Sequence, residues 1–243
     1  IGSIEKNPTD CYVFKDGKIE KETIELIPGL YKIFDEILVN AIDQWTRLKM
    51  NGDKYQVENI RVNINRETNS VTVYNDGRGI PIEFHKEHQV FIPELIFGEL
   101  LSSENYDQDE KKITGGKNGL GAKLTNIYST EFHLETVDVE QKKKYTQKFE
   151  QNMSVKHDAM IKSYSGKPYT QIKFHPDLDK FGIPDGIPDD IYNFMIKRVY
   201  DICACTDVNV YFNDEKIGMK GLLKYSELYF EDKTEKVYEY VND

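Results

Sequence analysis

The ten residues from Thr114 to Lys123 combine four glycines with two lysines, and an apolar-periodic segment from Leu124 to Tyr128 follows them. Glycine lets backbone N–H groups approach an anion closely, and a helix start offers unpaired donors at the positive end of its dipole. Lys117 and Lys123 would add positive charge. The pattern predicts a phosphate-binding loop, although a glycine-rich loop before a helix also serves as a plain turn.

Two well-known phosphate motifs do not fit this loop. The Walker pattern G-x-x-x-x-G-K-[ST] fails because Ala122 intrudes and Leu124 stands where the magnesium-binding hydroxyl belongs. The dinucleotide pattern G-x-G-x-x-G fails because the glycines here are ordered G-x-x-G-x-G. The loop is therefore a third kind of phosphate cradle, or none.

A second set of polar residues shares one stripe of a predicted helix from Leu30 to Trp45. Glu36, Asn40 and Asp43 stand at i, i+4 and i+7. The amide oxygen of Asn40 suits magnesium, which needs few protein ligands beside phosphate oxygens, and Glu36 could orient or deprotonate a water near a terminal phosphate. Asp43 could support the same stripe. Ordinary solvated surface is the alternative, and a mid-helix asparagine counts against it.

A third set surrounds the turn from Asn75 to Pro81. An Asn or Asp before a double-glycine turn can reach an adenine amino group, and Gly77 and Gly79 would let a flat base lie against backbone; on chemistry alone Asn75 and Asp76 are equally suitable. The hydroxyl of Thr170 could contact the base or its bound water. The same residue types also form plain turns after strands.

The elements that must position these residues are groups of predicted strands with predicted helices between the groups. A hairpin is predicted from two runs about Glu67 to Asn69, a short helix follows, and strands and a second long helix come after the glycine loop. The predicted strands are Asn59–Asn65, Ser70–Asn75, Glu131–Val137, Lys144–Glu150, Tyr169–His175 and Asp207–Asn213, and the further helices are Pro93–Leu101 and Asp189–Cys203. The order predicts an α+β fold, a two-layer sandwich whose mixed, mostly antiparallel sheet carries helices on one face.

Composition limits the function classes. At 243 residues the chain can bury a substantial core, and its formal charge of -10 argues against its being the main grip on a nucleic acid. Three cysteines fit neither a disulfide framework nor a zinc site, which favours reduced thiols and an intracellular setting. No stretch of about 18 apolar residues predicts a membrane span.

Together these motifs resemble the GHKL ATPase superfamily, and most narrowly the N-terminal ATPase domain of eukaryotic-type DNA topoisomerase II. The segments that carry the resemblance are Phe34 to Asp43, Asn75 to Pro81 and Thr114 to Lys123, with Pro28 to Phe34, Ile92 to Gly98, Tyr106-Asp107 and Asn126 to Phe132 beyond the nucleotide motifs. The likeness extends from Ile1 to about Phe230. It implies the two-layer α/β sandwich of the GHKL (Bergerat) type.

The resemblance also implies roles for single residues. Glu36 matches the catalytic base, Asn40 the ligand of magnesium and phosphate, and Asn75, rather than Asp76, the nucleotide-binding residue. The resemblance further implies cofactor binding at Ser103, Glu104, Asn105, Gly116, Lys117, Asn118, Gly119, Leu120, Gly121, Ala122 and Lys123. The chemical argument above adds Gly77, Gly79 and Thr170 to the cofactor-binding positions. Glu104 departs from a Ser-Ser-Asn pattern, and since a carboxylate beside polyphosphate is unfavourable, we expect it to point away or to contribute only backbone.

The implied activity is that of an ATP-binding, ATP-hydrolysing gate in a type II topoisomerase, an isomerase. Its cofactors would be ATP and Mg²⁺, it would homodimerise as an N-terminal gate, and other domains would bind double-stranded DNA in the nucleus. We expect residues 1–230 to form the ATPase domain without its N-terminal strap, and residues 231–243 to begin the connection to a transducer domain that supplies a further catalytic lysine. Turnover by the chain alone should therefore be weak or absent.

The alternative function is a non-hydrolysing GHKL module used for dimerisation or regulation. Glu36 counts against this alternative, because loss of hydrolysis would begin with loss of the base. A chaperone or kinase ATPase is disfavoured, since the sequence of the glycine loop looks much more like topoisomerase.

Overall fold

The computed structural model describes residues 2–100 and 120–230, together with Val237 and Glu239. Its centre is a nine-stranded sheet in which β9 pairs with β8 and the other strands follow the order β10-β8-β7-β11-β4-β3-β12-β13. The strands are β3 (Asn59–Asn65), β4 (Ser70–Asp76), β7 (Ser129–Asp138), β8 (Lys143–Glu150), β9 (Val155–Lys156), β10 (Met160–Ser163), β11 (Tyr169–Pro176), β12 (Asn209–Phe212) and β13 (Glu215–Lys216). Among these strands only β3 and β12 pair in parallel. The prediction of a mixed, mostly antiparallel sheet is confirmed.

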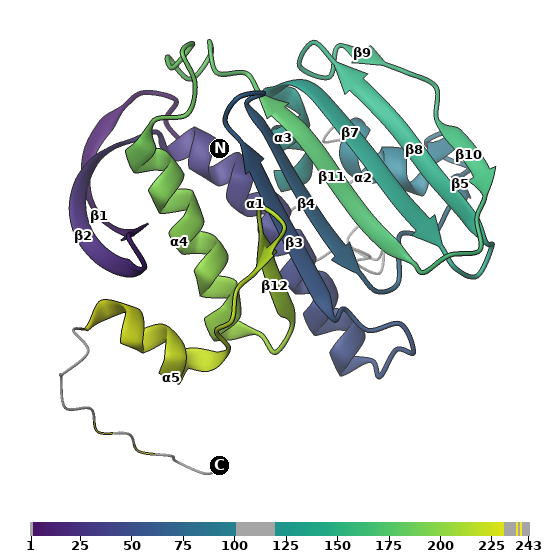
Figure 1. Ribbon diagram of the computed structural model, residues 1–243. Helices are drawn as coiled ribbons and strands as arrows, with labels where there is room; N and C mark the ends of the chain where they lie inside the picture. Colours follow the sequence, from purple (N-terminus) through teal and green to yellow (C-terminus); the bar gives the residue numbers. More distant parts are fainter. Residues whose placement is uncertain (1, 101–119, 231–236, 238, 240–243) are drawn as a thin grey trace.

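Four helices lie on one face of this sheet (Figure 1). They are α1 (Pro28–Met50), α2 (Ile92–Gly98), α3 (Gly121–Ile127) and α4 (Asp189–Cys205). The core between the layers is apolar and includes the fully buried Phe34, Phe132 and Phe174. The predicted two-layer α+β sandwich is therefore confirmed. No helix of the described residues combines the length and the apolar composition needed to cross a bilayer.

Several elements were not predicted from the sequence. A hairpin of β1 (Asn7–Lys15) and β2 (Lys18–Leu26) stands outside the main sheet and packs on α4, where Phe14 stacks on Tyr200 with ring centroids 4.1 Å apart. The remaining elements are the short pair β5 (Phe84–His85) and β6 (Val90–Phe91), the helix α5 (Gly221–Ser226) and the 3₁₀ turn η2 (Glu227–Tyr229). Helix α5 packs on α4 and η2 on β2, while Phe91 of β6 packs on Tyr145 of β8.

Helix α1 is longer than its predicted range. Pro28 occupies the first turn, as its fixed φ favours, and the apolar stripe continues past Trp45 to the buried Leu48. Arg47 and Lys49 lie in the last turn, where positive charge is favourable. The predicted helix at Pro93, by contrast, ends at Gly98, because Glu99 already takes an extended backbone conformation.

Helix α1 is fixed to the neighbouring helices by polar contacts as well as by its apolar face. The Arg198 Nε of α4 donates to the Asp35 Oδ1 of α1 at 2.6 Å, and both side chains are less than one-fifth exposed. The Thr125 hydroxyl of α3 donates to the Ile33 carbonyl at 2.9 Å. These contacts set how far α1 can slide or rotate relative to α3 and α4.

Replacing Asp35 with Asn should therefore lower the free energy of unfolding by about 2 kcal/mol, because the largely buried guanidinium of Arg198 loses its counter-charge. Urea denaturation followed by circular dichroism measures the change. The matched control is Glu22→Gln at the more exposed Lys15–Glu22 pair, which should cost clearly less because water screens an exposed ion pair. An Asp35→Asn effect no larger than that of the control would contradict the anchoring role.

Candidate functional site

The structure describes only part of the predicted site. Seven of its residues lie outside the described residues, so nothing structural follows for them: Ser103, Glu104, Asn105, Gly116, Lys117, Asn118 and Gly119. The predicted residues of α1, of the turn after β4, of β11 and of the loop end from Leu120 to Lys123 are all described.

The predicted stripe of Glu36, Asn40 and Asp43 lies on α1, and all three residues are half-buried. Gln44, which was not predicted, stands one turn after Asn40 and is half-buried as well. At one end Glu36 touches Gly121, and at the other the Gln44 Nε2 donates to the Arg78 carbonyl at 2.6 Å. With a rise of about 1.5 Å per residue, Asn40 lies about 6 Å along the axis from both Glu36 and Gln44. Together with Gln44, the stripe thus spans from the start of α3 to the turn after β4.

The Glu36 carboxylate has a neighbour at each oxygen. Lys32, one turn earlier on α1, places its Nζ 2.6 Å from Oε1. A Cβ on Gly121 would lie 1.7 Å from Oε2, so any side chain there would displace the carboxylate. Glycine at this position therefore lets α3 begin directly against Glu36, and the carboxylate is held in one orientation.

Asn40 and Asp43 make the middle of the stripe favourable for a cation. The Asn40 side chain forms no hydrogen bond with any other described residue, so its amide oxygen is available. Burial, and then the negative charge of Glu36, raise the pKa of the Asp43 carboxyl. The described residues contain no group of three or more His, Cys, Asp or Glu that could hold a metal by themselves. One amide oxygen beside carboxylates fits a magnesium ion that takes its other ligands from water and phosphate.

At the far end of the stripe, the two candidates for the adenine contact have different surroundings. Asp76 is fully engaged: its carboxylate accepts the backbone N–H groups of Glu58 and Asn59 at 2.7 and 2.8 Å. Asn75 lies on the opposite face of β4 and is 6% exposed. Its Nδ2 donates to the Asp76 carbonyl at 2.9 Å, while its Oδ1 accepts from no described residue. An acceptor is thus available at Asn75 and not at Asp76.

The turn after β4 lies directly on β7, and glycine makes this approach feasible. Gly77 has φ +92°, and a Cβ there would come within 2.9 Å of Val57. A Cβ on Gly79 would lie 2.1 Å from the Val137 carbonyl oxygen. Glycine is therefore required at both positions because the turn packs against Val57 and against β7 more closely than a side chain would allow.

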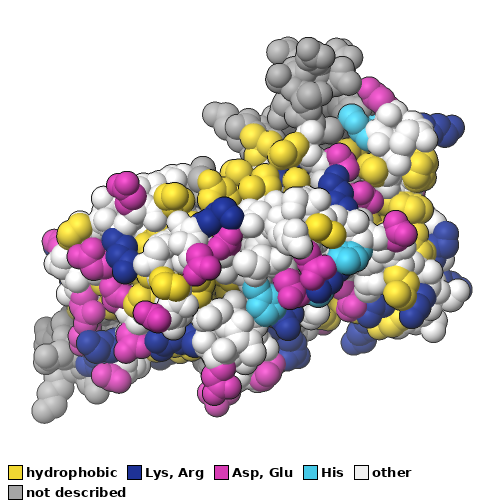
Figure 2. Space-filling view, turned by 90° about the horizontal axis from the view of Figure 1, so that it is seen from above, with side chains coloured by type: hydrophobic (Ala, Val, Ile, Leu, Met, Phe, Trp, Pro, Cys, Tyr) yellow, Lys and Arg dark blue, Asp and Glu magenta, His cyan; other side chains and the backbone are white. Residues whose placement is uncertain are grey.

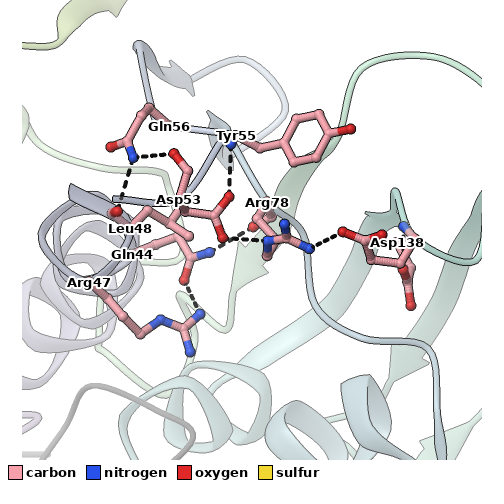
Figure 3. A network of polar contacts seen from close by, with 9 residues as sticks. Gln44, Arg47, Leu48, Asp53, Tyr55, Gln56, Arg78 and Asp138 are labelled. Atoms are coloured by element: carbon pink, nitrogen blue, oxygen red, sulfur yellow. Dashed lines mark hydrogen bonds and ion pairs between the residues drawn. The ribbon is translucent and has the colours of Figure 1, made fainter. Parts of the chain in front are cut away.

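Arg78, which the sequence analysis did not single out, clamps this turn from outside (Figure 3). Its Nε lies 2.6 Å from the Asp53 Oδ2, its Nη1 2.7 Å from the Glu140 Oε1, and its backbone N–H donates to the Tyr55 carbonyl at 3.0 Å. The clue to Arg78 in the sequence is that an arginine stands between the two glycines of the turn. Gln44 and Lys32 were also missed, although each is four residues from a predicted site residue.

Thr170 lies beside Asn75 on the helix-covered face of the sheet. The two residues face each other across β11 and β4, and Thr170 faces Thr136 across β11 and β7. The two threonine hydroxyls are 2.9 Å apart. The predicted Thr170 and Asn75 are thus brought together, and Thr136 is a neighbour that sequence reasoning missed.

The described end of the glycine loop contains a buried cation. Lys123 is 5% exposed, and burial lowers its pKa, partly offset by the negative charge of Glu99. No ion pair joins Lys123 to another described residue. Ala122 is buried, whereas Leu120 is exposed. A lysine in this environment gains most from an anion brought to it.

The surface is in keeping with the overall charge. Figure 2 shows acidic and basic side chains intermixed over one face of the molecule, without a continuous basic area. This agrees with the net charge of -10 and with the expectation that this chain is not the main grip on a nucleic acid.

Comparison with known proteins gives consistent similarities. The family described as histidine kinase-, DNA gyrase B- and HSP90-like ATPase matches residues 25–176. A probable DNA topoisomerase 2 from Dictyostelium discoideum is 47% identical over 234 residues, which is 96% of this chain and 15% of that protein. The chain thus spans about one-seventh of the length of this relative.

Solved structures show the same similarity. The ATPase region of Saccharomyces cerevisiae topoisomerase II matches with a TM-score of 0.83 and 45% identity, over 94% of this chain and 60% of that structure. The ATPase and transducer domains of DNA topoisomerase II from Balamuthia mandrillaris match with a TM-score of 0.82 and 41% identity, over 94% and 59%.

The raised pKa of Asp43 leads to a testable pH dependence. Because the folded chain holds this proton more tightly than the unfolded chain, the stability associated with Asp43 is present at low pH and is lost as the pH rises through the folded-state pKa. Asp43→Asn should therefore unfold at a higher temperature than the unmodified chain at pH 7. The difference should shrink as the pH falls toward 4. Thermal melts of the metal-free protein measure it.

Asp53 provides a control of opposite sign. Burial acts to raise its pKa, but the hydrogen bonds from Arg78 and from the Tyr55 amide outweigh burial, so the pKa is lowered. Asp53→Asn should therefore melt at a lower temperature than the unmodified chain at pH 7, and this loss should shrink in acid. Shifts of the same sign in both variants would exclude this account.

Proposed function

Because the chain belongs to the family of histidine kinase-, DNA gyrase B- and HSP90-like ATPases, we propose that it binds ATP with Mg²⁺ and hydrolyses the terminal phosphate. Its fold is the GHKL ATPase fold, as in the ATPase regions of topoisomerase II that it matches. The observation that supports this function most strongly is the contact of Gly121 with the Glu36 carboxylate. It brings the end of the proposed phosphate loop to the proposed base.

In the proposed reaction Glu36 acts on the attacking water. A water between the carboxylate and the terminal phosphate donates a hydrogen bond to Glu36, and its oxygen attacks phosphorus as its proton passes to the carboxylate. The bond from phosphorus to the bridging oxygen breaks, which leaves ADP and inorganic phosphate. Lys32 holds one carboxylate oxygen and so keeps the other directed toward Gly121.

Phosphate binding is assigned to the loop that ends at Lys123. The buried ammonium of Lys123, without a described counter-ion, would pair with phosphate oxygens. Asn40 would hold the magnesium ion through its amide oxygen. When bound, magnesium supplies charge neutralisation between the phosphates. The loop residues before Leu120 are assigned to the same role by resemblance.

The base end of the proposed site is formed by Asn75, Gly77, Gly79 and Thr170. The Asn75 Oδ1 would accept from the adenine amino group, and the base would lie against the backbone of the glycine turn. The engagement of Asp76 with Glu58 and Asn59 favours Asn75 for this role.

At the level of the whole protein we infer a gate. The relatives named DNA topoisomerase 2 are several times longer than this chain, and one matched structure contains both an ATPase and a transducer domain. Residues 1–230 would form the ATPase domain, residues 231–243 would lead toward a transducer, and two copies would close on ATP. That closure would drive the passage of double-stranded DNA, held by other domains, in the nucleus.

The role of Glu36 can be tested by Glu36→Gln. The amide keeps the shape of the side chain but cannot take a proton, so ATP affinity should change less than about threefold while hydrolysis falls by at least about a hundredfold. Calorimetry measures binding, and phosphate release under single-turnover conditions measures hydrolysis. The control is the exposed Glu67→Gln, which should change neither. Full hydrolysis by Glu36→Gln would remove the base assignment.

The role of Asn40 is tested by the magnesium dependence of binding. ATP affinity of the unmodified chain should rise when Mg²⁺ replaces EDTA, and Asn40→Ala should lose most of that gain, about tenfold in affinity. Asn193→Ala, on the half-buried face of α4, is the matched control and should keep it. If Asn40→Ala kept the full magnesium gain, another residue would have to hold the ion.

A further inference from the structure

Thr136 of β7 is a fully buried polar residue that neither the resemblance nor the proposed function uses. Its hydroxyl oxygen has three neighbours within hydrogen-bond distance. It accepts the Ile80 backbone N–H at 3.0 Å, donates to the Tyr169 carbonyl at 3.2 Å, and lies 2.9 Å from the Thr170 hydroxyl. The residue therefore connects the glycine turn to the strand beside Asn75.

The proton arrangement of these groups follows from their chemistry. A hydroxyl has one hydrogen and two lone pairs. The Ile80 N–H can only donate and the Tyr169 carbonyl can only accept, so the single hydrogen of Thr136 is directed to that carbonyl. Either hydroxyl could donate in the contact between Thr136 and Thr170, but all three contacts are hydrogen bonds at once only when Thr170 donates to the remaining lone pair of Thr136. Thr170 consequently has only lone pairs left for a ligand.

Asn75 presents an acceptor on the same side. Thr170 and Asn75 are direct neighbours across β11 and β4, so their side chains extend from the same face, about 5 Å apart at Cβ. The Asn75 Nδ2 donates to the Asp76 carbonyl, which leaves Oδ1 without a partner among the described residues. Two acceptors side by side match an amino group, which has two hydrogens, and oppose a carbonyl oxygen.

We propose that Thr136 is a positioning residue that fixes the Thr170 hydroxyl as an acceptor and so makes the base end selective for a 6-amino purine over a 6-oxo purine. The proposal rests on the nucleotide-binding function proposed above. Thr136 itself is fully buried and reaches the base only through Thr170. Its contribution is to the ratio of two affinities, not to binding as such.

The test compares ATP with inosine triphosphate, which has a 6-oxo group in place of the amino group. In Thr136→Val the Thr170 hydrogen is released and can turn toward the 6-oxo group. The preference of the purified chain for ATP should then fall by about tenfold, the worth of one hydrogen bond. Calorimetric titration of both nucleotides with Mg²⁺ gives the ratio. Thr136→Ser restores the hydroxyl and should restore the preference, whereas a purely structural role would change both affinities together.

Two further variants keep the test decisive. Thr72→Val, on the other face of β4, removes a threonine hydroxyl away from the site and should leave the ratio unchanged. If Thr136→Val does not fold because the Ile80 N–H is left unpaired, Thr170→Ala replaces it and should also lower the ratio by about tenfold. An unchanged ratio in the folded Thr136→Val or in Thr170→Ala would overturn the inference. If the unmodified chain binds neither nucleotide, the proposed function fails, and this inference fails with it.

Discussion

The position of helix α1 relative to its neighbours is the constraint on which the candidate site depends. Its apolar face is buried in the core, while Asp35 pairs with Arg198 of α4 and the Ile33 carbonyl accepts from Thr125 of α3. Because these contacts lie on several sides, the helix cannot rotate without breaking at least one of them. The positions of Glu36, Asn40 and Gln44 are thereby fixed. The start of α3 and the turn after β4 contact this row of side chains at its two ends.

The charged groups of the candidate site are separated by sign. Its negative groups gather on α1, where Asp43 has a raised pKa, and its buried cation Lys123 is on the start of α3. Among the described residues, neither the Asp43 carboxylate nor the Lys123 ammonium has surroundings that favour its charged form. Such an arrangement lowers the stability of the fold. It favours a ligand that has both a metal ion and phosphate oxygens, because each would pair with a charge of the opposite sign.

Much of the fold could be predicted because its periodic signals are strong. The predicted Asn59–Asn65 strand and the start of the helix at Asp189 match the structure, since alternation and helical periodicity reflect the burial of one face. The hairpin of β1 and β2 was missed because its burial depends on α4, almost two hundred residues later, and its own sequence alternates weakly. Most of α1, from Leu30 to Trp45, was likewise predicted from its helical periodicity. Arg78 and Thr136 were not predicted, since their partners are brought close by the sheet and by the turns. Lys32 was missed although its partner Glu36 is only one helical turn away.

The parallel pairing of β12 with β3 has a consequence for how the chain acquires this structure. Asn59 and Asn209 are 150 residues apart in sequence and adjacent in the sheet. Closing a loop of that length costs about 4 kcal/mol of chain entropy before the pairing contributes anything. During synthesis from the N-terminus, β3 can pair with β4 early, but its other edge stays open until β12 has left the ribosome. That open edge is exposed to pairing with other chains, so this strand is where misassembly of a nascent or truncated chain should begin.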